Sequence, residues 1–312
     1  MQNLDHAIQM ISVHINAIDN INAALATDVT GVTLGDLNRL VTVSNAQSSL
    51  LSGYQQAMLD NNLLSITDGS ELQSLINRVN GDDALIALVN NAIINNTTLT
   101  QEAWQTGGIL NDVRADGYLD AYQSHLTEQS AFTSAADIQT FINNVNNSVD
   151  SLALISAAAD SDTGETVTLA ALQNVIGLTN IDVDNLTAYR GEIVKSSSAT
   201  LADAAALQAV IVRTNASVTA FDVVVTAAVT NNASEVSEAV LSDIIDLIFD
   251  VTNLSSYQSA IAQASEIAIL SELQTLINDV DASVTAFALV QMQHSATTPV
   301  TSQRMYWPIS LT

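Results

Sequence analysis

The stretch ELQSLINRVN at residues 71–80 decides the fold class. Its apolar residues Leu72, Leu75, Ile76 and Val79 are spaced i, i+3, i+4 and i+7, which places them on one face of an α-helix. The pattern returns as DIQTFINNVN at 137–146, ALQAVIVRTN at 206–215 and ELQTLINDVD at 272–281, with a fainter copy, IQMISVHIN, at 8–16. The sequence therefore predicts one helix that recurs along the chain.

A second landmark has the same period. The recurring tyrosines, Tyr54, Tyr122, Tyr189 and Tyr257, are 68, 67 and 68 residues apart. The Leu/Ile-Gln pairs of the helical pattern are 64, 66, 69 and 66 residues apart. Because two unrelated landmarks share a period of about 67 residues, we expect tandem structural units.

The expected fold is therefore all-α, a tandem array of about four helical units that forms an extended rod. We expect a partial N-terminal unit at 1–26, four units at 27–93, 94–159, 160–229 and 230–295, and a divergent tail at 296–312. No linker rich in Pro, or in Gly and Ser, separates the units, so adjoining units should pack directly.

Each unit should contain further helical segments. After the pattern at 206–215, Ser217 either caps a second helix or lies inside a continuous one. Residues 168–176 should form a helix that ends before Gly177, a C-cap residue, and residues 184–194 should form another with Asp184 as its N-cap. The polar runs at 95–98 and 230–234 predict loops.

Composition excludes several classes of protein. The chain has 33 acidic and 7 basic residues, for a net charge of −26, so we expect no nucleic acid as a partner, and the charge disfavours an anionic membrane surface. Its 48% hydrophobic residues exclude a disordered acidic tail. Since there is no Cys, disulfide scaffolds, thiolate zinc sites and iron–sulfur clusters are excluded as well.

Targeting signals are not evident. The first residues, MQNLDH, lack the basic and apolar segments of a secretory signal. No apolar run approaches the roughly 18 residues that a membrane-spanning helix needs, so we expect no transmembrane segment. An exported chain of this kind would use a non-classical or type I route, or be a fragment of a longer protein.

The phrases DNLTAYRGEI at 184–193 and ALQAVI at 206–211 resemble the α-helical tandem repeats of large bacterial surface proteins and adhesins. The resemblance covers nearly the whole chain. It implies a non-catalytic, extracellular or cell-surface protein whose units extend a binding end or assemble into a lattice. No Gly-rich calcium-binding nonapeptide array or ligand-binding head is recognisable.

Asp160, Asp162 and Glu165 are the candidate metal ligands. The run DSDTGE at 160–165 alternates oxygen-bearing side chains before a Gly, as loops that bind calcium do. It departs from the EF-hand because Gly164 is fifth and Ala171 replaces the bidentate Glu at position 12. The alternatives are a solvated acidic turn and diffuse calcium binding between acidic surfaces of neighbouring subunits.

No pattern predicts catalysis. His6, His14, His125 and His294 have no acidic partners at ligand spacing, and neither a P-loop nor a nucleophile elbow occurs. We therefore expect no enzyme, no catalytic residues and no cofactor other than calcium.

The recurring aromatic and amide residues are expected to be structural. The four tyrosines should pack in the core with their hydroxyls at its rim, and Phe141, Phe221 and Phe287 should be core residues. The recurring polar residues should cap or join helices; they are Asn16, Asn80, Asn146, Asn215 and Asp281.

The leading functional hypothesis is a structural subunit that self-assembles into a filament or surface layer (S-layer), as a homo-oligomer or homopolymer. The alternatives are a spacer or stalk segment of an adhesin, whose partner is a host or neighbouring cell surface, and a glycan- or protein-binding module. With 48% hydrophobic and 13% charged residues, the composition favours buried contact between subunits.

Overall fold

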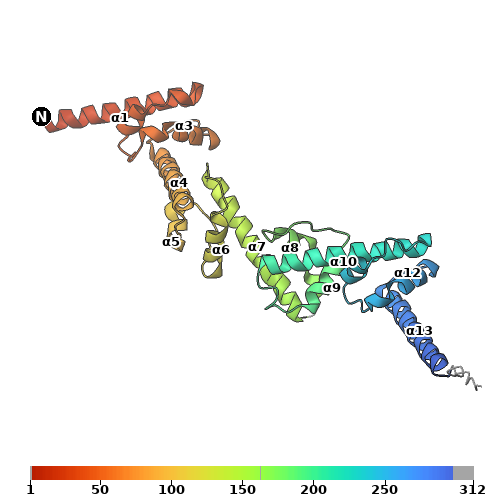
Figure 1. Ribbon diagram of the computed structural model, residues 1–312. Coiled ribbons are helices and arrows are strands. Elements are labelled where there is room, and N and C mark those ends of the chain that lie inside the picture. Colours follow the sequence, from red (N-terminus) through yellow and green to blue (C-terminus); the bar gives the residue numbers. More distant parts are fainter. Residues whose placement is uncertain (1, 162, 298–312) are drawn as a thin grey trace, which may run out of the picture. The chain divides into compact units, whose positions relative to one another are not determined.

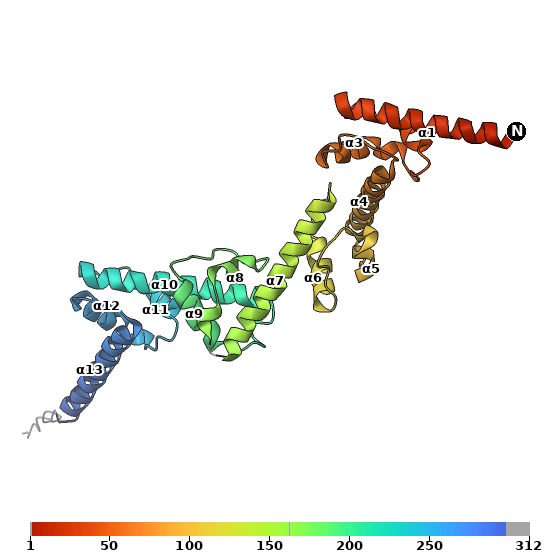
Figure 2. The same cartoon turned by 180° about the vertical axis from the view of Figure 1, so that it is seen from behind.

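A computed structural model describes residues 2–161 and 163–297 of the chain. Within these residues the protein is 71% helical, with thirteen α-helices and no β-strand (Figure 1; Figure 2 gives the reverse view). The prediction of an all-α fold is thus confirmed. Most of the predicted tail at 296–312 lies outside the described residues.

Five long helices, each of 26 to 28 residues, carry the apolar pattern of residues 71–80 and its copies. They are α1 (Gln2–Thr27), α4 (Ser70–Asn95), α7 (Ala135–Ser161), α10 (Ala204–Thr230) and α13 (Leu270–Thr297). The continuous α10 decides between the two predictions for Ser217, which lies inside the helix and does not cap one.

Between successive long helices come a short helix and then a ten-residue helix. The short helices are α2 (Leu34–Arg39), α5 (Gln101–Trp104), α8 (Leu169–Asn174) and α11 (Glu238–Asp243). Each has a Thr or Ser at its N-cap that accepts a backbone N–H three residues later; these caps are Thr33, Thr100, Thr168 and Ser237. The ten-residue helices are α3 (Leu51–Asp60), α6 (Gly117–Leu126), α9 (Leu186–Lys195) and α12 (Leu254–Gln263).

Five 3₁₀ turns complete the described elements: η1 (Val29–Gly31), η2 (Ser48–Leu50), η3 (Thr106–Gly108), η4 (Gly164–Thr166) and η5 (Val251–Asn253). The predicted loops at 95–98 and 230–234 each begin one residue later, because α4 ends at Asn95 and α10 at Thr230, and the left-handed residues Asn96 and Asn231 follow them.

Two predicted helix ends differ from the structure. Helix α8 ends at Asn174 with Val175 as its C-cap, so Gly177, at φ +95°, follows three residues after the helix. Asn185 occupies the N-cap position of α9, and no side chain caps it. Asp184 instead donates its backbone N–H to Asp182 Oδ1 in the turn before the helix.

The chain divides into two compact units, residues 1–151 and 152–312, with the division inside α7. In the first unit, one core lies between the C-terminal half of α1 and the N-terminal half of α4. In the second unit, cores lie between the C-terminal half of α7 and the N-terminal half of α10, and between the C-terminal half of α10 and the N-terminal half of α13. Helix α10 is therefore shared by two cores.

The first unit also contains an aromatic cluster. The ring of Trp104 stacks on Phe141 at a centroid distance of 6.1 Å and meets Tyr122 edge-on at 5.7 Å. All three side chains are buried, so the prediction for Phe141 is confirmed.

Phe221 is half-buried against its core, but Phe287 is 64% exposed, so the prediction that it is a core residue is wrong. No described residue follows α13 in the way that α11 and α12 follow α10.

One described helix, α10, is long and apolar enough to cross a membrane by length and composition alone. Core helices of soluble proteins and signal sequences can have the same length and composition. Helix α10 carries Arg213 and Asp222, and its buried residues, among them Leu207, Ile211 and Val224, pack in the two cores that it shares.

Candidate functional site

The four recurring tyrosines lie on the four ten-residue helices, one each, with side chains that are fully buried. Their place in the core is confirmed. Their hydroxyls are not at a solvent-exposed rim, because each accepts a backbone N–H from the loop before its helix. The donors are Gln47 to Tyr54 (2.9 Å), Arg114 to Tyr122 (3.1 Å), Asp182 to Tyr189 (3.0 Å) and Asp250 to Tyr257 (3.0 Å).

Each hydroxyl also donates to an amide or carboxylate oxygen on the following long helix. The pairs are Tyr54 with Asn80 (2.6 Å), Tyr122 with Asn146 (2.5 Å), Tyr189 with Asn215 (2.5 Å), and Tyr257 with Asp281. We call each such pair, with its loop, a tyrosine latch. The predicted role of these Asn and Asp residues in joining helices is confirmed for the four latches, and none of the four caps a helix.

In three latches the amide nitrogen also holds a loop carbonyl. Asn80, Asn146 and Asn215 donate through Nδ2 to the carbonyls of Asn45 (2.9 Å), Asp112 (2.9 Å) and Asn180 (2.8 Å). Each of these loop residues has a positive φ, between 55° and 59°. Asn and Asp tolerate this conformation better than other residues with a side chain. Asn16, on α1, is exposed and has no such latch partner among the hydrogen bonds of the described residues.

The recurring Gln of the helical pattern holds the same loops. Its Oε1 accepts a backbone N–H and its Nε2 donates to the carbonyl of the same loop residue. The pairs are Gln73 with Ser44, Gln139 with Asn111, Gln208 with Thr179 and Gln274 with Ile248. This glutamine clamp lies seven residues, or about two helical turns, before the latch residue. Sequence reasoning found the repeating Gln but assigned it no role.

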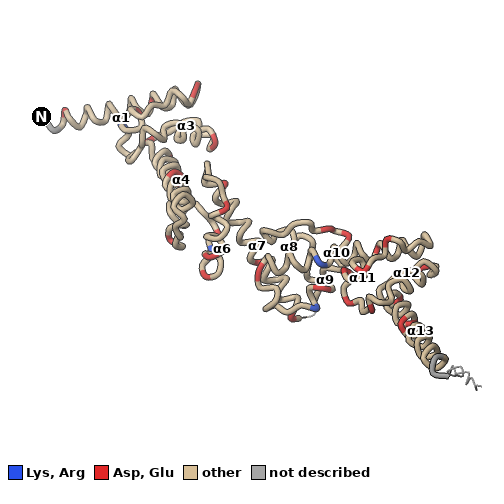
Figure 3. Tube along the Cα trace, viewed as in Figure 1, with Lys and Arg blue, Asp and Glu red and all other residues tan. Residues whose placement is uncertain are grey.

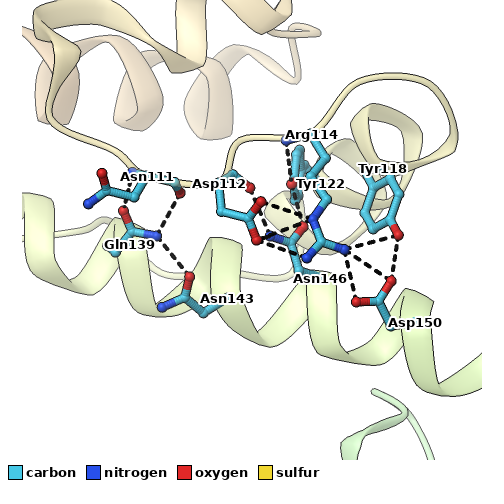
Figure 4. A network of polar contacts seen from close by, with 9 residues as sticks. All are labelled: Asn111, Asp112, Arg114, Tyr118, Tyr122, Gln139, Asn143, Asn146 and Asp150. Carbon is cyan, nitrogen blue, oxygen red and sulfur yellow. Dashed lines mark hydrogen bonds and ion pairs between the residues drawn. The ribbon is translucent and has the colours of Figure 1, made fainter.

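The second latch extends into the polar network of Figure 4. Arg114 bonds Asp112 through Nη2 (2.9 Å) and Asp150 through Nη1 (2.8 Å), and Nη1 also bonds the Tyr118 hydroxyl (3.1 Å). The Tyr118 hydroxyl and then Arg114 lower the pKa of Asp150, and Arg114 lowers the pKa of Asp112. Both carboxylates are therefore ionised at neutral pH, and they serve the network as acceptors.

A second ion cluster brings together basic residues that are scattered in the sequence. The nearly buried carboxylate of Glu192 accepts from Lys195 Nζ (2.8 Å) and Arg213 Nη2 (2.7 Å). Lys195 also contacts Asp246 Oδ2 at 2.5 Å, and Asp246 followed by Glu192 raises the pKa of the lysine. Acidic residues are spread along the chain and far outnumber the basic ones (Figure 3).

The candidate calcium ligands have the following places. Asp160 accepts the backbone N–H of Ser198 at 2.9 Å, a bond that lowers the pKa of its carboxyl. Glu165 is exposed in η4, and Asp162 lies outside the residues that the structure describes. Among residues 2–161 and 163–297, no group of three or more His, Asp and Glu side chains is placed to hold a metal ion. Calcium binding at 160–165 stays a prediction.

Two of the histidines, His14 and His125, contact a backbone amide and a carboxylate. His6 is exposed, and His14 Nδ1 accepts the backbone N–H of Val41 at 3.3 Å. His125 lies 3.7 Å from Glu128 on an adjacent turn.

A groove with a volume of about 1200 Å³ lies between α12 and α13. Its walls carry small hydroxyl side chains and an apolar row of Leu276, Val280, Val284 and Phe287. Two carboxylates, Glu272 and Asp279, also line it.

No family model, no curated protein and no solved structure matches this chain.

Proposed function

We propose that the protein is a non-catalytic structural subunit, a tandem array of four helical units that self-assembles outside the cell into a filament or surface layer. The observation that carries this proposal is the fourfold recurrence of the tyrosine latch and the glutamine clamp. The polar side chains that repeat join helices to loops, so the repeated residues have a structural role. A binding module would instead repeat an exposed residue set.

The surface supports assembly over a role as a free monomer. Large apolar side chains remain exposed in a chain with 48% hydrophobic and 13% charged residues. The net charge of −26 opposes close packing of identical subunits, so assembly should require cations or salt to screen it. Calcium between acidic surfaces of adjacent subunits would serve the same purpose.

Negative-stain microscopy and light scattering on the purified chain test the proposal, in calcium, after chelation, and in chelator with high salt. We expect ordered filaments or sheets in calcium. Assemblies that persist in chelator only at high salt would assign the cation effect to screening. Single particles under all three conditions at high concentration would contradict self-assembly and favour the spacer or stalk of an adhesin.

A further inference from the structure

The same five residues, Ser-Val-Thr-Ala-Phe, occur on two long helices in different surroundings. At 217–221 in α10, Ser217 Oγ accepts the backbone N–H of Ile245 at 2.9 Å, and Phe221 packs against a core. At 283–287 in α13, Ser283 and Phe287 line the groove between α12 and α13. Among the described residues, Ser283 Oγ donates to the carbonyl of Asp279 in its own helix, and Phe287 is 64% exposed.

On earlier long helices, the surface that corresponds to the one around Ser283 is contacted by the loop after the next short helix. On α10 this loop contains Ile245 and Asp246, and Asp246 also pairs with Lys195 of α9. On α1 the equivalent loop donates the backbone N–H of Val41 to His14. On α4, Gly107 approaches so closely that a Cβ on Gly81 would lie 3.4 Å from its Cα. Within the described residues, α13 has no loop of this kind.

The opposite end of the chain carries a matching apolar helix face. Leu4, Ile8, Ile11 and Ile15 are spaced i, i+4, i+7 and i+11 on α1 and are each 51–65% exposed. We call these four residues the α1 face. With Leu289 and Val290 of α13 and Met10 of α1, the two end helices expose a concentration of large apolar side chains.

The register of the helices shows that residues equivalent to part of this face are buried in the chain's interior. Asn22 on α1 and Asn90 on α4 make the same pair of bonds to loop residues Ile66 and Phe132, which aligns the two helices at an offset of 68. Leu4 and Ile8 then correspond to Leu72 and Ile76, which are fully buried in α4. The faint sequence copy at 8–16 is thus displaced by four residues, about one helical turn, from this alignment.

We propose that the α1 face of one copy of the chain packs into the α12–α13 groove of a second copy. This rests on the proposed function, and names the surfaces through which the subunits join. An amphipathic helix in a groove between two helices buries both apolar surfaces. The contact is head-to-tail, and each copy keeps one unused surface of each kind, so further copies can add at both ends.

Charge favours this contact over others on an acidic chain. Residues 282–294 of α13 contain no acidic side chain. Residues 4–15 of α1 contain one acidic residue, Asp5, and two histidines, His6 and His14. The carboxylates that line the groove, Glu272 and Asp279, lie in the first part of α13. The two end surfaces therefore meet with little of the repulsion that a net charge of −26 imposes elsewhere.

The test uses two charge-introducing variants of the full chain, Ile8→Glu on the α1 face and Phe287→Glu in the groove. The matched control is Ile94→Glu, at a position that is 79% exposed on α4. Each of the two variants should weaken self-association about tenfold or more, while the control assembles as the wild type does. Circular dichroism checks that all three variants keep the helical content of the wild type.

Mixing the two variants gives the decisive result. Ile8→Glu chains keep an intact groove and Phe287→Glu chains keep an intact α1 face, so the mixture should form dimers and no longer species by light scattering. A monomeric mixture would overturn the proposal and assign the groove to another occupant. Dimers of either variant alone would overturn it as well, because they require a symmetric contact.

A cysteine pair provides a second readout. Because the chain has no Cys, a disulfide between an Ile11→Cys copy and a Val284→Cys copy would report this contact specifically. A wild-type chain that assembles while both Glu variants assemble equally well overturns this interface and leaves the proposed function standing. A wild-type chain that stays monomeric under all conditions overturns both.

Discussion

Tyr189 and Tyr257 occupy the same place in successive parts of the chain, but the long-helix residue that accepts their hydroxyls differs. Asn215 accepts from Tyr189 and from Asn185 through Oδ1, and donates through Nδ2 to the carbonyl of Asn180. Asp281 accepts from Tyr257 and from Asn253 through one oxygen, and an ionised carboxylate has no proton to donate to a loop.

The loop differs together with the latch residue. The residue that follows the clamped loop position is Asn45, Asp112 or Asn180 in three latches, each at positive φ, but it is Phe249 in the fourth. Phe249 is not among the described residues with positive φ, and its ring meets Tyr257 edge-on at 6.4 Å. The comparison teaches that the buried ring is the constant part of the latch, whereas its polar partners vary.

The largest effect should come from removing that ring. Tyr189→Ala and Tyr257→Ala should each destabilise their surroundings by about 3–5 kcal/mol, because both leave a large cavity in a packed core. The measurement is native-state hydrogen exchange in peptides that cover α9 and α12, since a chain of repeated elements need not unfold in two states. Tyr189→Phe, which keeps the ring, is the control; equal costs for Ala and Phe would show that the hydroxyl dominates the latch.

Removing the latch residue should lower stability less than removing the ring, and the loss should differ between the two latches. Asn215→Ala leaves the Tyr189 hydroxyl and the Asn180 carbonyl without this partner, which should cost about 1–3 kcal/mol. Asp281→Ala should cost less, because no loop carbonyl loses a donor. Protection of the Asp182 and Asp250 amides, which bond the two hydroxyls, reports each loss locally. A larger loss at Asp281 would contradict this account.

Exchanging the two latch residues sharpens the comparison. Asn215→Asp removes one donor and should cost about 1 kcal/mol. Asp281→Asn keeps an oxygen acceptor for Tyr257 and Asn253, and should change stability by less than about 0.5 kcal/mol, because the loop at Phe249 lacks the left-handed residue of the other latches. Urea unfolding of both variants, followed by exchange in the same peptides, checks this asymmetry. Stabilisation by Asp281→Asn well above that value would mean that the loop readily adopts the other conformation.

The smallest effect should appear only at alkaline pH. Burial raises the pKa of Tyr122, and burial followed by the hydrogen bond to Asp281 raises the pKa of Tyr257. A raised pKa in the folded state contributes stability that is fully present below the unfolded pKa of about 10 and is lost as pH rises through the folded pKa. Tyr257→Phe should therefore make this alkaline loss of stability shallower, measured as exchange protection across that pH range. An unchanged slope would show that the hydroxyl is not responsible.

Local pattern was sufficient to predict several parts of the structure. Apolar spacing at 71–80 and its copies predicted the long helices, and polar runs predicted their ends at Asn95 and Thr230, because helix faces and caps depend on near neighbours. The period of the tyrosines predicted that they lie in the core, since a large ring recurring on an apolar phrase needs a place to pack.

The local pattern did not predict contacts between residues that are far apart in the sequence. The clamp of Gln208 on Thr179 and the ion pair of Glu192 with Arg213 join residues that are 29 and 21 positions apart, and no local spacing signals them. The recurrence of Gln at one position of the four helical phrases was the available signal for the clamp, but it did not say what these side chains contact. Which loop these Gln side chains bind depends on the tertiary fold, because the loop must pack against the long helix that carries the Gln.

The sequence by itself determined that this protein is helical, that its elements recur about every 67 residues and that its tyrosines are buried, because these properties follow from short-range spacing. Only the tertiary structure decided that Ser217 and Phe221 are covered while the identical Ser283 and Phe287 line an open groove. Burial belongs to a side chain and its neighbours together, and two identical stretches of sequence have different neighbours.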